Sequence, residues 1–550
     1  MVEKSRPWFK LYDKGVPYSV IYPPLSIKQM FNSCAEANPE RDYLIVNDTK
    51  LPYGLVNMMA RKAANALTDL GVKKGDRVAL MSPNVPQYVI AYQACAKIGA
   101  IVVQVNPLAP TPEVHHYVKD SGAETVIVMA AFAKGPIEVL KASQKSGDTA
   151  LRNVITFQVP SGAVEVESAP GVLDFNDVVG AGADEEPSVD VRPDDILMLQ
   201  YTGGTTGLSK GCVLTNRNLV AIAYQESYWM APVFEKTDHL RCLAAVPLYH
   251  IYGFNMNVNV NHVFGGTIIL VPQPSTDNVL AAVNAHEPNL FPAVPAMIIG
   301  LNQHPDISTS KIGSVKAVVS GSAPLPLEAM KTFEELSGAL IFEGYGMSET
   351  SNIVTANPLF TVRKPGGVGI PFPDNDVRIV DLETGEKDMP LGEPGELLCK
   401  GPTVMREYWN NPAETEKTFR DGWLLTGDIA VMDSDGHIFI VDRKKDMILS
   451  SGFNVYPREI DELMYTHPKV LQACSFGIPD PKRGESLKLT LVLKPGEEMT
   501  VEEVREFCKS NLSGYKVPVQ VAFLSELPVT SVGKPDRKRL RQLELEGQLS

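Results

Sequence analysis

The 550-residue chain contains 44% hydrophobic and 21% charged residues, as folded globular proteins do and disordered, collagen-like or heptad-repeat chains do not. Because its length exceeds one ordinary hydrophobic core, we expect a large body and at least one smaller domain. The formal net charge of −14 argues against partners such as a nucleic-acid backbone or an anionic membrane surface.

Cysteine usage and the termini indicate the compartment. Seven scattered cysteines include no Cys-x-x-Cys pair, which favours a reducing environment. The N-terminus has no apolar stretch behind its charges, and no run of about 18 apolar residues suggests an integral membrane segment. The final Gly-Gln-Leu-Ser differs from the peroxisomal signal Ser-Lys-Leu. We therefore expect a cytoplasmic protein, as a monomer or homodimer.

The order of the predicted elements indicates an α/β fold. Short apolar runs at 196–199, 267–271 and 315–319 alternate with helical patterns at 278–286 and 325–335. This alternation predicts a large N-terminal body of mixed, largely parallel sheets flanked by helices.

A change of organisation follows the body. Strand patterns lie closer together at 377–400 and 438–441, which predicts a small β-rich section. Beyond the basic junction Arg443-Lys-Lys-Asp446, the last hundred or so residues have their own helix and strand patterns, including a capping box at Thr500. We predict a large domain over 1–443 and a small, mobile α+β domain over 444–550.

The most informative segment is a glycine-rich loop, Tyr201 to Gly211, that follows a buried-strand pattern and precedes a helix pattern. Its backbone N–H groups, hydroxyls and one lysine suit a polyphosphate such as that of ATP. The spacing differs from that of P-loop NTPases. The loop's candidate ligand-binding residues are Thr202, Gly203, Gly204, Thr205, Thr206, Gly207 and Lys210. Taken alone, an ordinary surface loop is the competing interpretation.

This loop resembles the phosphate loop of the adenylate-forming superfamily, which includes acyl-CoA synthetases, peptide-synthetase adenylation domains and beetle luciferases. Other family motifs follow in the family's order over residues 40–540. They are Pro247-Leu-Tyr-His250, Ser320-Gly-Ser-Ala-Pro324, Glu343-Gly-Tyr-Gly-Met-Ser-Glu-Thr350, Thr426-Gly-Asp428, Asp442-Arg443, Ser451-Gly-Phe-Asn454 and Pro528-Val-Thr-Ser-Val-Gly-Lys534. The resemblance implies an enzyme that uses ATP and Mg²⁺ to form an acyl-adenylate and, as an acyl-CoA synthetase, passes the acyl group to coenzyme A.

The resemblance also implies roles for residues that local patterns do not identify. Lys534 bridges the carboxylate and the α-phosphate, where charge must be stabilised. Glu349 holds Mg²⁺, with Thr202 as a second contact. Tyr345 stacks on adenine. The other nucleotide-site residues are Gly321, Ser322, Ala323, Glu343, Gly344, Gly346, Met347, Ser348 and Thr350.

Further roles concern the ribose, the thiol and the hinge. Asp428 and Arg443 contact ribose or phosphate, and His250 positions groups at the entrance for the thiol. The small domain rotates about Lys445 between the two half-reactions, which brings Gly452 to the tunnel for coenzyme A.

The acyl pocket is predicted to be apolar and aromatic, with no cation for a second carboxylate. Its predicted residues are Tyr249, His250, Tyr252, Gly253, Phe254, Gly321, Gly344, Gly346 and Met347. This favours an aromatic, alicyclic or medium-chain monocarboxylate, with a short fatty acid next. The alternatives are an enzyme that loads a carrier protein, a luciferase-type oxidase, and a non-catalytic adenylate-binding protein.

Two features depart from the expected pattern. Gly203 and Ser209 replace the more frequent Ser and Pro of the phosphate loop, which could loosen it. The asparagines at 255, 257, 259 and 261 fall in an otherwise apolar segment, where buried amides need hydrogen-bond partners. We predict that they line either a polar part of the acyl pocket or a wet interface.

Overall fold

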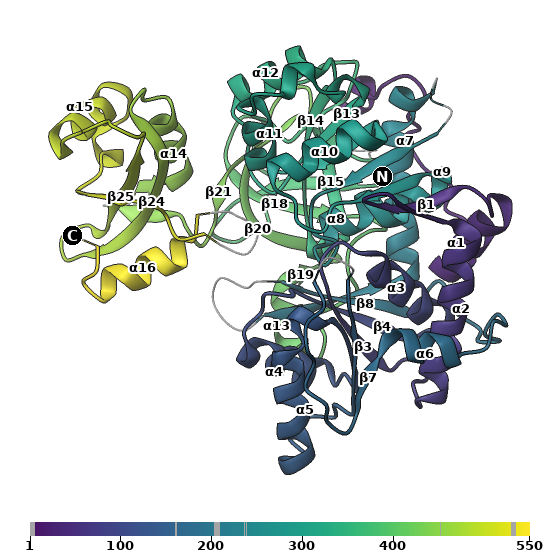
Figure 1. Cartoon of the computed structure of the whole chain (residues 1–550). Helices are drawn as coiled ribbons and strands as arrows, with labels where there is room; N and C mark the ends of the chain where they lie inside the picture. The colour runs from purple at the N-terminus through teal and green to yellow at the C-terminus, as the bar shows by residue number, and fades with distance from the viewer. Residues whose placement is uncertain are drawn as a thin grey trace. The chain divides into compact units, whose positions relative to one another are not determined.

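A computed structural model describes residues 6–159, 162–202, 209–235, 237, 239–450, 453–529 and 535–549. The described residues form two compact units (Figure 1). Unit 1 comprises those of Met1–Asp376 and Lys400–Leu424, and unit 2 those of Val377–Cys399 and Leu425–Ser550.

The larger sheet of unit 1 has nine strands in the order β16-β15-β14-β13-β12-β10-β11-β1-β2. Its central pairs, from β1 through β11, β10, β12 and β13 to β14, are parallel, and antiparallel hairpins close both edges. The strands are β1 (Asp42–Val46), β2 (Thr49–Pro52), β10 (Arg241–Ala244), β11 (Thr267–Leu270), β12 (Leu290–Ala293), β13 (Ala317–Ser320), β14 (Leu340–Met347), β15 (Asn352–Ala356) and β16 (Ile370–Pro371).

The second sheet of unit 1 has seven strands in the order β7-β6-β5-β3-β4-β8-β9, all parallel except the β8–β9 hairpin. The strands are β3 (Arg77–Met81), β4 (Ile101–Val105), β5 (Thr125–Met129), β6 (Asn153–Phe157), β7 (Val172–Asp174), β8 (Ile196–Thr202) and β9 (Lys210–Thr215). The prediction of mixed, largely parallel sheets is confirmed.

Thirteen helices lie in the described part of unit 1. They are α1 (Ile27–Ala37), α2 (Tyr53–Asp69), α3 (Pro86–Ile98), α4 (Thr111–Ser121), α5 (Lys134–Ser146), α6 (Phe175–Ala181), α7 (Asn216–Phe234), α8 (Ile251–Phe254), α9 (Val260–Phe264), α10 (Thr276–His286), α11 (Pro295–Asn302), α12 (Leu327–Ser337) and α13 (Pro412–Thr418). Local sequence sets their starts: Thr215 forms a capping box for α7, and Ser275 caps α10. Helix α12 begins two residues later than predicted, since Pro326 occupies its N-cap.

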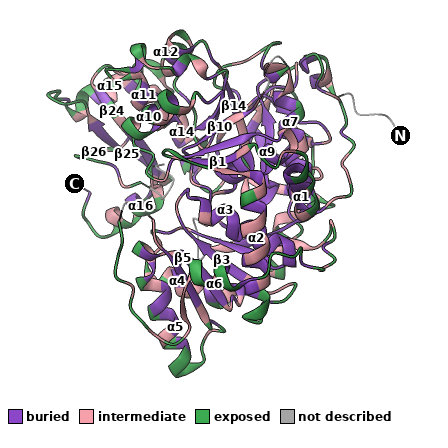
Figure 2. Cartoon of the chain, turned by 45° about the vertical axis from the view of Figure 1, so that its right-hand side comes forward, coloured by how far each residue is buried: buried purple, intermediate pink, exposed green. Residues whose placement is uncertain are grey.

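Each sheet of unit 1 packs its apolar side chains against helices. One core joins strand residues such as Leu243, Phe291 and Val318 to α10, α11 and α12. A second joins the seven-stranded sheet to α4 and α5. In Figure 2 the central strands are buried along their length, whereas α5 and α12 present exposed residues on their outer sides. Among the helices of the described residues, none combines the length and hydrophobicity that a membrane span requires.

Unit 2 contains the β-rich section and an α+β part. The section's strands are β17 (Asp376–Val380), β18 (Gly395–Lys400), β20 (Trp423–Met432) and β21 (Ile438–Arg443), with the short β19 (Phe419–Arg420) paired to the start of β20. The α+β part has β22 (Ile448–Ser450), β23 (Phe453–Val455), β24 (Val470–Asp480), β25 (Gly484–Leu493) and β26 (Gln520–Phe523) with α14 (Pro457–Tyr465), α15 (Val501–Asn511) and α16 (Arg537–Leu545). The predicted α+β character and the capping box at Thr500 are confirmed.

The compact units divide the chain differently from the predicted boundary. The β-rich section, Val377–Cys399 and most of β20 and β21, belongs to the same compact unit as the C-terminal part. The boundary at 443/444 concerns which part rotates, and it stays a prediction.

The asparagine series lies in an irregular helix. Residues Asn255–Asn259 form a π-helical turn, η3, between α8 and α9, and all four asparagines are fully buried. Each side-chain amide donates a hydrogen bond within the protein. The acceptors are the Ser351 carbonyl for Asn255, the Gly253 carbonyl for Asn257 at 2.7 Å, the Asn255 side chain for Asn259 at 2.6 Å and the Asn257 carbonyl for Asn261 at 2.6 Å. Neither predicted environment, a polar acyl pocket or a wet interface, is needed to satisfy these donors.

A buried acid on α7 lies beside this helix. Glu226 is 1% exposed, and it accepts a hydrogen bond from the Asn352 side chain. Its other carboxyl oxygen has no partner among the described residues. Burial raises the pKa of Glu226 to about 8, so the folded protein holds this side chain as a neutral acid at neutral pH.

A Glu226→Gln variant tests this protonation state. Because folding raises the pKa of Glu226 from 4.5 to about 8, its contribution to stability is complete below the lower value and is lost as the pH rises through the upper one. We expect the wild type to lose roughly 4 kcal/mol relative to Glu226→Gln between about pH 4.5 and about pH 8. Thermal midpoints of both proteins across this range measure the difference. The exposed Glu328→Gln is the control, and a pH-independent difference for Glu226→Gln would contradict the assignment.

Candidate functional site

The motif residues of unit 1 meet at the carboxyl ends of the nine-stranded sheet. Ser320, the last residue of β13, lies in register with Ala293 of β12 and with Glu343 of β14. The His250 motif follows β10, which neighbours β12 in the same sheet. Ligands of parallel α/β sheets bind outside the carboxyl ends of the strands, so the register alone brings these distant motifs to one edge.

His250 caps the short helix α8. Its Nδ1 accepts a hydrogen bond from the Tyr252 N–H at 3.3 Å. In the neutral ring, the proton therefore resides on Nε2. This contact fixes the ring at the helix start, which is what a positioning role requires.

Tyr252 braces the sheet beneath the Ser320-Gly-Ser-Ala motif. Its hydroxyl lies 2.7 Å from the Val319 carbonyl oxygen and accepts from the Ala293 N–H at 3.1 Å. A Cβ on Gly321 would lie 3.3 Å from the Tyr252 ring, so glycine permits this close packing. Because the scaffold already uses the hydroxyl, only the ring of Tyr252 is left for an acyl-pocket role.

The other predicted acyl-pocket residues near α8 are also tightly packed. Phe254 is fully buried, with its ring centroid 4.6 Å from that of Tyr92 in an edge-on contact. A Cβ on Gly253 would lie 2.4 Å from the Pro247 carbonyl oxygen. Tyr249 is half-buried, and burial raises the pKa of its hydroxyl. Contact with an acyl group at these positions stays a prediction.

The predicted adenine segment runs along β14. Glu343, at the crossing from parallel to antiparallel pairing, accepts from the Leu325 N–H at 3.0 Å and the Gly366 N–H at 3.4 Å, so its carboxylate ties two loops to the strand. Tyr345 is half-buried and faces Thr355 in register on β15. Ser322, on the adjacent loop, has φ 73°, a conformation that non-glycine residues adopt rarely.

Glu349 lies in the short 3₁₀ turn η6 (Ser348–Thr350) after β14. It is 7% exposed, accepts from the Tyr408 hydroxyl at 2.7 Å, and its backbone carbonyl accepts from the Met405 N–H at 2.7 Å. Within the described ranges, no three His, Cys, Asp or Glu side chains gather to hold a metal. A single carboxylate that completes its coordination with phosphates and water fits Mg²⁺.

Tyr408 connects Glu349 to Lys210, and the sequence patterns did not identify it. The Lys210 ammonium lies 4.5 Å from the Tyr408 ring centroid and 3.1 Å from Glu414. Burial and the nearby Glu349 raise the pKa of Tyr408, which keeps its hydroxyl a donor. The segment around Tyr408 runs beside β9, since the Trp409 N–H donates to the Gly211 carbonyl at 2.8 Å. The adjacent aromatic residues 408–409, outside any periodic pattern, were the available signal.

The phosphate loop is described only at its base. Thr202 and Lys210 face each other in the β8–β9 hairpin, and His116 Nε2 contacts the Ser209 carbonyl at 2.8 Å. The predicted residues Gly203, Gly204, Thr205, Thr206 and Gly207 lie outside the described residues, as do Gly452 and Lys534. Lys210 and Glu349 are thus the predicted phosphate and metal contacts that the described structure brings to one residue, Tyr408.

Unit 2 carries the predicted ribose pair and hinge. Asp428 on β20 and Arg443 on β21 lie in register, with Arg443 Nε 3.5 Å from an Asp428 carboxylate oxygen. Lys444 is held to Glu396 at 2.8 Å. Burial and the neighbouring Arg443 lower the pKa of Lys445 to about 8.

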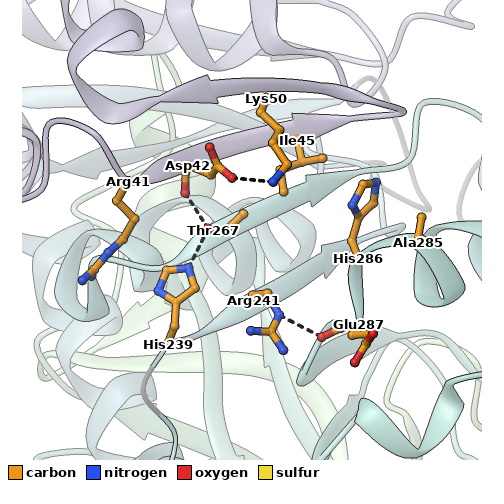
Figure 3. A pocket seen from close by; sticks show the side chains of 10 residues that line it. All are labelled: Arg41, Asp42, Ile45, Lys50, His239, Arg241, Thr267, Ala285, His286 and Glu287. Carbon is orange, nitrogen blue, oxygen red and sulfur yellow. Dashed lines mark hydrogen bonds and ion pairs between the residues drawn. The ribbon is translucent and has the colours of Figure 1, made fainter.

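A polar hollow lies at the opposite edge of the nine-stranded sheet, near the amino ends of β1, β10 and β11 (Figure 3). It includes Arg41, His239 and Arg241 among its lining residues, and His239 Nε2 contacts the Thr267 hydroxyl at 2.7 Å. None of the residues predicted for catalysis or substrate binding lines it. The motif residues therefore depend on the carboxyl edge and not on this hollow.

Comparisons with known proteins match both parts of the chain. Residues 31–409 match the family model described as AMP-binding enzyme, and residues 459–534 match the AMP-binding enzyme C-terminal domain. The chain is 36% identical over 559 residues to a long-chain-fatty-acid–CoA ligase of Bacillus subtilis (strain 168), with 99% of each chain covered. It is 33% identical over 504 residues to a feruloyl-CoA synthase of Amycolatopsis sp, with 91% of this chain and 95% of that one covered.

A solved structure matches at the level of the whole fold. The crystal structure of the anthranilate CoA ligase AuaEII in complex with anthranoyl-AMP superposes with a TM-score of 0.86 at 26% sequence identity, covering 97% of this chain and 100% of that one. The arrangement of sheets described above is therefore shared with an acyl-CoA ligase structure.

Two glycines of the β14 motif provide a matched test of why glycine stands there. A Cβ on Gly346 would lie 1.7 Å from the Asn352 carbonyl oxygen of β15, whereas a Cβ on Gly344 would make contacts no closer than 3.4 Å. We expect Gly346→Ala to lose about 3 kcal/mol of stability or more and to impair ATP binding, because the hairpin must shift. Gly344→Ala should stay within about 1 kcal/mol of the wild type. Thermal midpoints and ATP titrations compare the two, and equal tolerance would contradict the packing argument.

Proposed function

Since this chain belongs to the AMP-binding enzyme family, as an AMP-forming acyl-CoA ligase, we propose that it activates an uncharged monocarboxylic acid with ATP. The acyl-adenylate forms with release of pyrophosphate, and the acyl group then passes to coenzyme A with release of AMP. The observation that carries this proposal is the meeting of the His250, Ser320 and Glu343 motifs at one edge of the sheet, with Glu349 and Lys210 joined through Tyr408.

The first half-reaction brings together two anions, the substrate carboxylate and the triphosphate. Lys210 and the N–H groups of the phosphate loop neutralise the phosphates, and Lys534 stabilises the charge that develops at the α-phosphorus. Mg²⁺ neutralises phosphate charge when bound, and Glu349 is the carboxylate that would hold it, with Thr202 as second contact. The buried position of Glu349 and its single fixed partner, Tyr408, support this role.

The second half-reaction needs different groups around the same carbonyl. Rotation of the small domain about Lys445 would exchange Lys534 for the segment around Gly452. His250, held by Tyr252, positions the acyl-adenylate for the thiol of coenzyme A. Asp428 and Arg443 hold the ribose and phosphate of the nucleotide.

Fatty acids and aromatic acids are the candidate substrates. The relatives' names favour a long-chain fatty acid first, since the Bacillus protein is a long-chain-fatty-acid–CoA ligase. The Amycolatopsis relative, a feruloyl-CoA synthase, keeps the aromatic acids of the sequence prediction as second candidates. The uncharged character of Tyr249, Tyr252, Gly321 and Met347 supports either class, because neither acid carries a second charge. Carrier-protein loading and non-catalytic binding are not favoured.

A substrate panel tests the proposed reaction. We expect labelled pyrophosphate to exchange into ATP only when an acid is supplied, and thioester to form only when coenzyme A is added as well. Saturated fatty acids of increasing length, ferulate and anthranilate form the panel. Exchange without thioester would point to a different acyl acceptor, and no exchange with any acid would overturn the proposal.

Lys534→Ala separates the two half-reactions. Removing one preorganised charge-stabilising group lowers a rate by about 10²- to 10³-fold. We expect that loss in adenylate formation, whereas thiolysis of a supplied acyl-adenylate should stay near the wild-type rate. Lys538→Ala, which removes a lysine of α16 outside the motifs, is the control for a charge loss. Equal loss of both half-reactions in Lys534→Ala would contradict the assigned role.

A further inference from the structure

The turn that follows Glu349 has a strained backbone. Ser351 has φ 59° and Asn352 has φ 147°, both in the region that side chains other than hydrogen disfavour. Such residues cost about 1–3 kcal/mol each and persist only where their surroundings hold them. The two residues directly join η6, which carries Glu349, to β15.

Two buried side chains from different helices hold these two residues. The Asn352 side-chain amide donates to the Glu226 carboxyl group of α7. The Asn255 side-chain amide, in the π-helical turn η3, donates to the Ser351 carbonyl oxygen. Glu226 is 1% exposed and Asn255 is fully buried, so neither contact competes with solvent. π-helical turns often occur at functional sites because they place side chains that a regular helix would not.

The other side of the turn is held by the segment 403–408. The Ser351 hydroxyl donates to the Thr403 carbonyl at 2.6 Å, and Tyr408 donates to Glu349 at 2.7 Å. The strained turn is therefore fixed between the segment beside the phosphate loop and a polar pair in the protein interior. A loss on the interior side would let the turn relax while its outer contacts still pull on Glu349.

The chemistry of Glu226 is specific for this contact. Most neighbouring positions on α7 are apolar and buried, among them Ile222, Ala223 and Met230. Asn352 is the hydrogen-bond partner of Glu226 in the described part of the chain. A neutral carboxylic acid at this position accepts from the Asn352 amide without introducing a buried charge.

We propose that Glu226 and Asn255 are positioning residues that hold the strained Ser351–Asn352 turn and thereby fix Glu349 for its metal and phosphate contacts. This inference rests on the proposed role of Glu349 in holding Mg²⁺. Neither residue touches substrate, and both act through the turn.

Three variants test the proposal. Glu226→Leu removes the acceptor for Asn352, and Glu226→Gln restores a neutral acceptor of the same shape. Asn289→Leu is the matched control, because Asn289 is 3% exposed and makes two side-chain hydrogen bonds at 2.8 Å, to the Arg241 N–H and the His239 carbonyl, at the opposite edge of the sheet. Each variant is measured by the Mg²⁺ dependence of pyrophosphate exchange, the KM of the acid, the thermal midpoint and amide hydrogen exchange of residues 348–356.

The expected pattern separates positioning from general destabilisation. Glu226→Leu should raise the Mg²⁺ concentration for half-maximal activity by about 10- to 100-fold, speed amide exchange at 348–356 and leave the KM of the acid within about twofold. Glu226→Gln should restore both readouts, and Asn289→Leu should lower the thermal midpoint alone. The proposal is overturned if Glu226→Leu changes only the midpoint, or if Glu226→Gln behaves like Glu226→Leu.

The amide-exchange arm keeps this proposal distinct from the proposed function. If the wild type catalyses no pyrophosphate exchange at any Mg²⁺ concentration, the proposed function fails. Faster amide exchange at 348–356 in Glu226→Leu, reversed in Glu226→Gln, would still support the clamp on the turn. Unchanged amide exchange would overturn it.

Discussion

The parallel register of β10, β12, β13 and β14 is the constraint on which the candidate site depends. Parallel strands that share a register end at the same edge, so the segments that follow them meet there. His250, Gly321 and Glu343 are separated by tens of residues in the sequence, yet each follows or ends one of these strands. A slip of one residue between β13 and β14 would turn every side chain of the strand to the other face.

Much of what surrounds the site serves to hold backbone in place. Tyr252, Glu343 and Asn255 spend their polar groups on backbone atoms of neighbouring loops and strands. Reactions that stabilise developing charge need donors and cations that are already in position, since reorganising them during the reaction would consume the benefit. The buried polar groups of this enzyme therefore contribute to catalysis through rigidity, and Tyr408 extends the same principle to Lys210 and Glu349.

The two compact units pose different physical problems. Unit 1 holds its motif residues on a broad, well-packed sheet, whereas the Asp428–Arg443 pair and Lys445 lie in unit 2. Two half-reactions at one carbonyl require different groups in turn, which a single rigid body cannot present. The grouping of the β-rich section with the C-terminal part shows that compactness and the proposed hinge need not divide the chain at the same residue.

The sequence by itself determined the family, the α/β class and the order of the motifs. Glycines, a capping threonine and strand patterns are local signals, and α7, α10, α15 and the main strands form where those signals predict. Local patterns could not identify Tyr408, Glu226 or the need for glycine at position 346, because each depends on a partner distant in the sequence. The tertiary structure alone decided those contacts: a hydroxyl on Glu349, an acid beneath Asn352, and a β15 carbonyl that leaves no room for a Cβ.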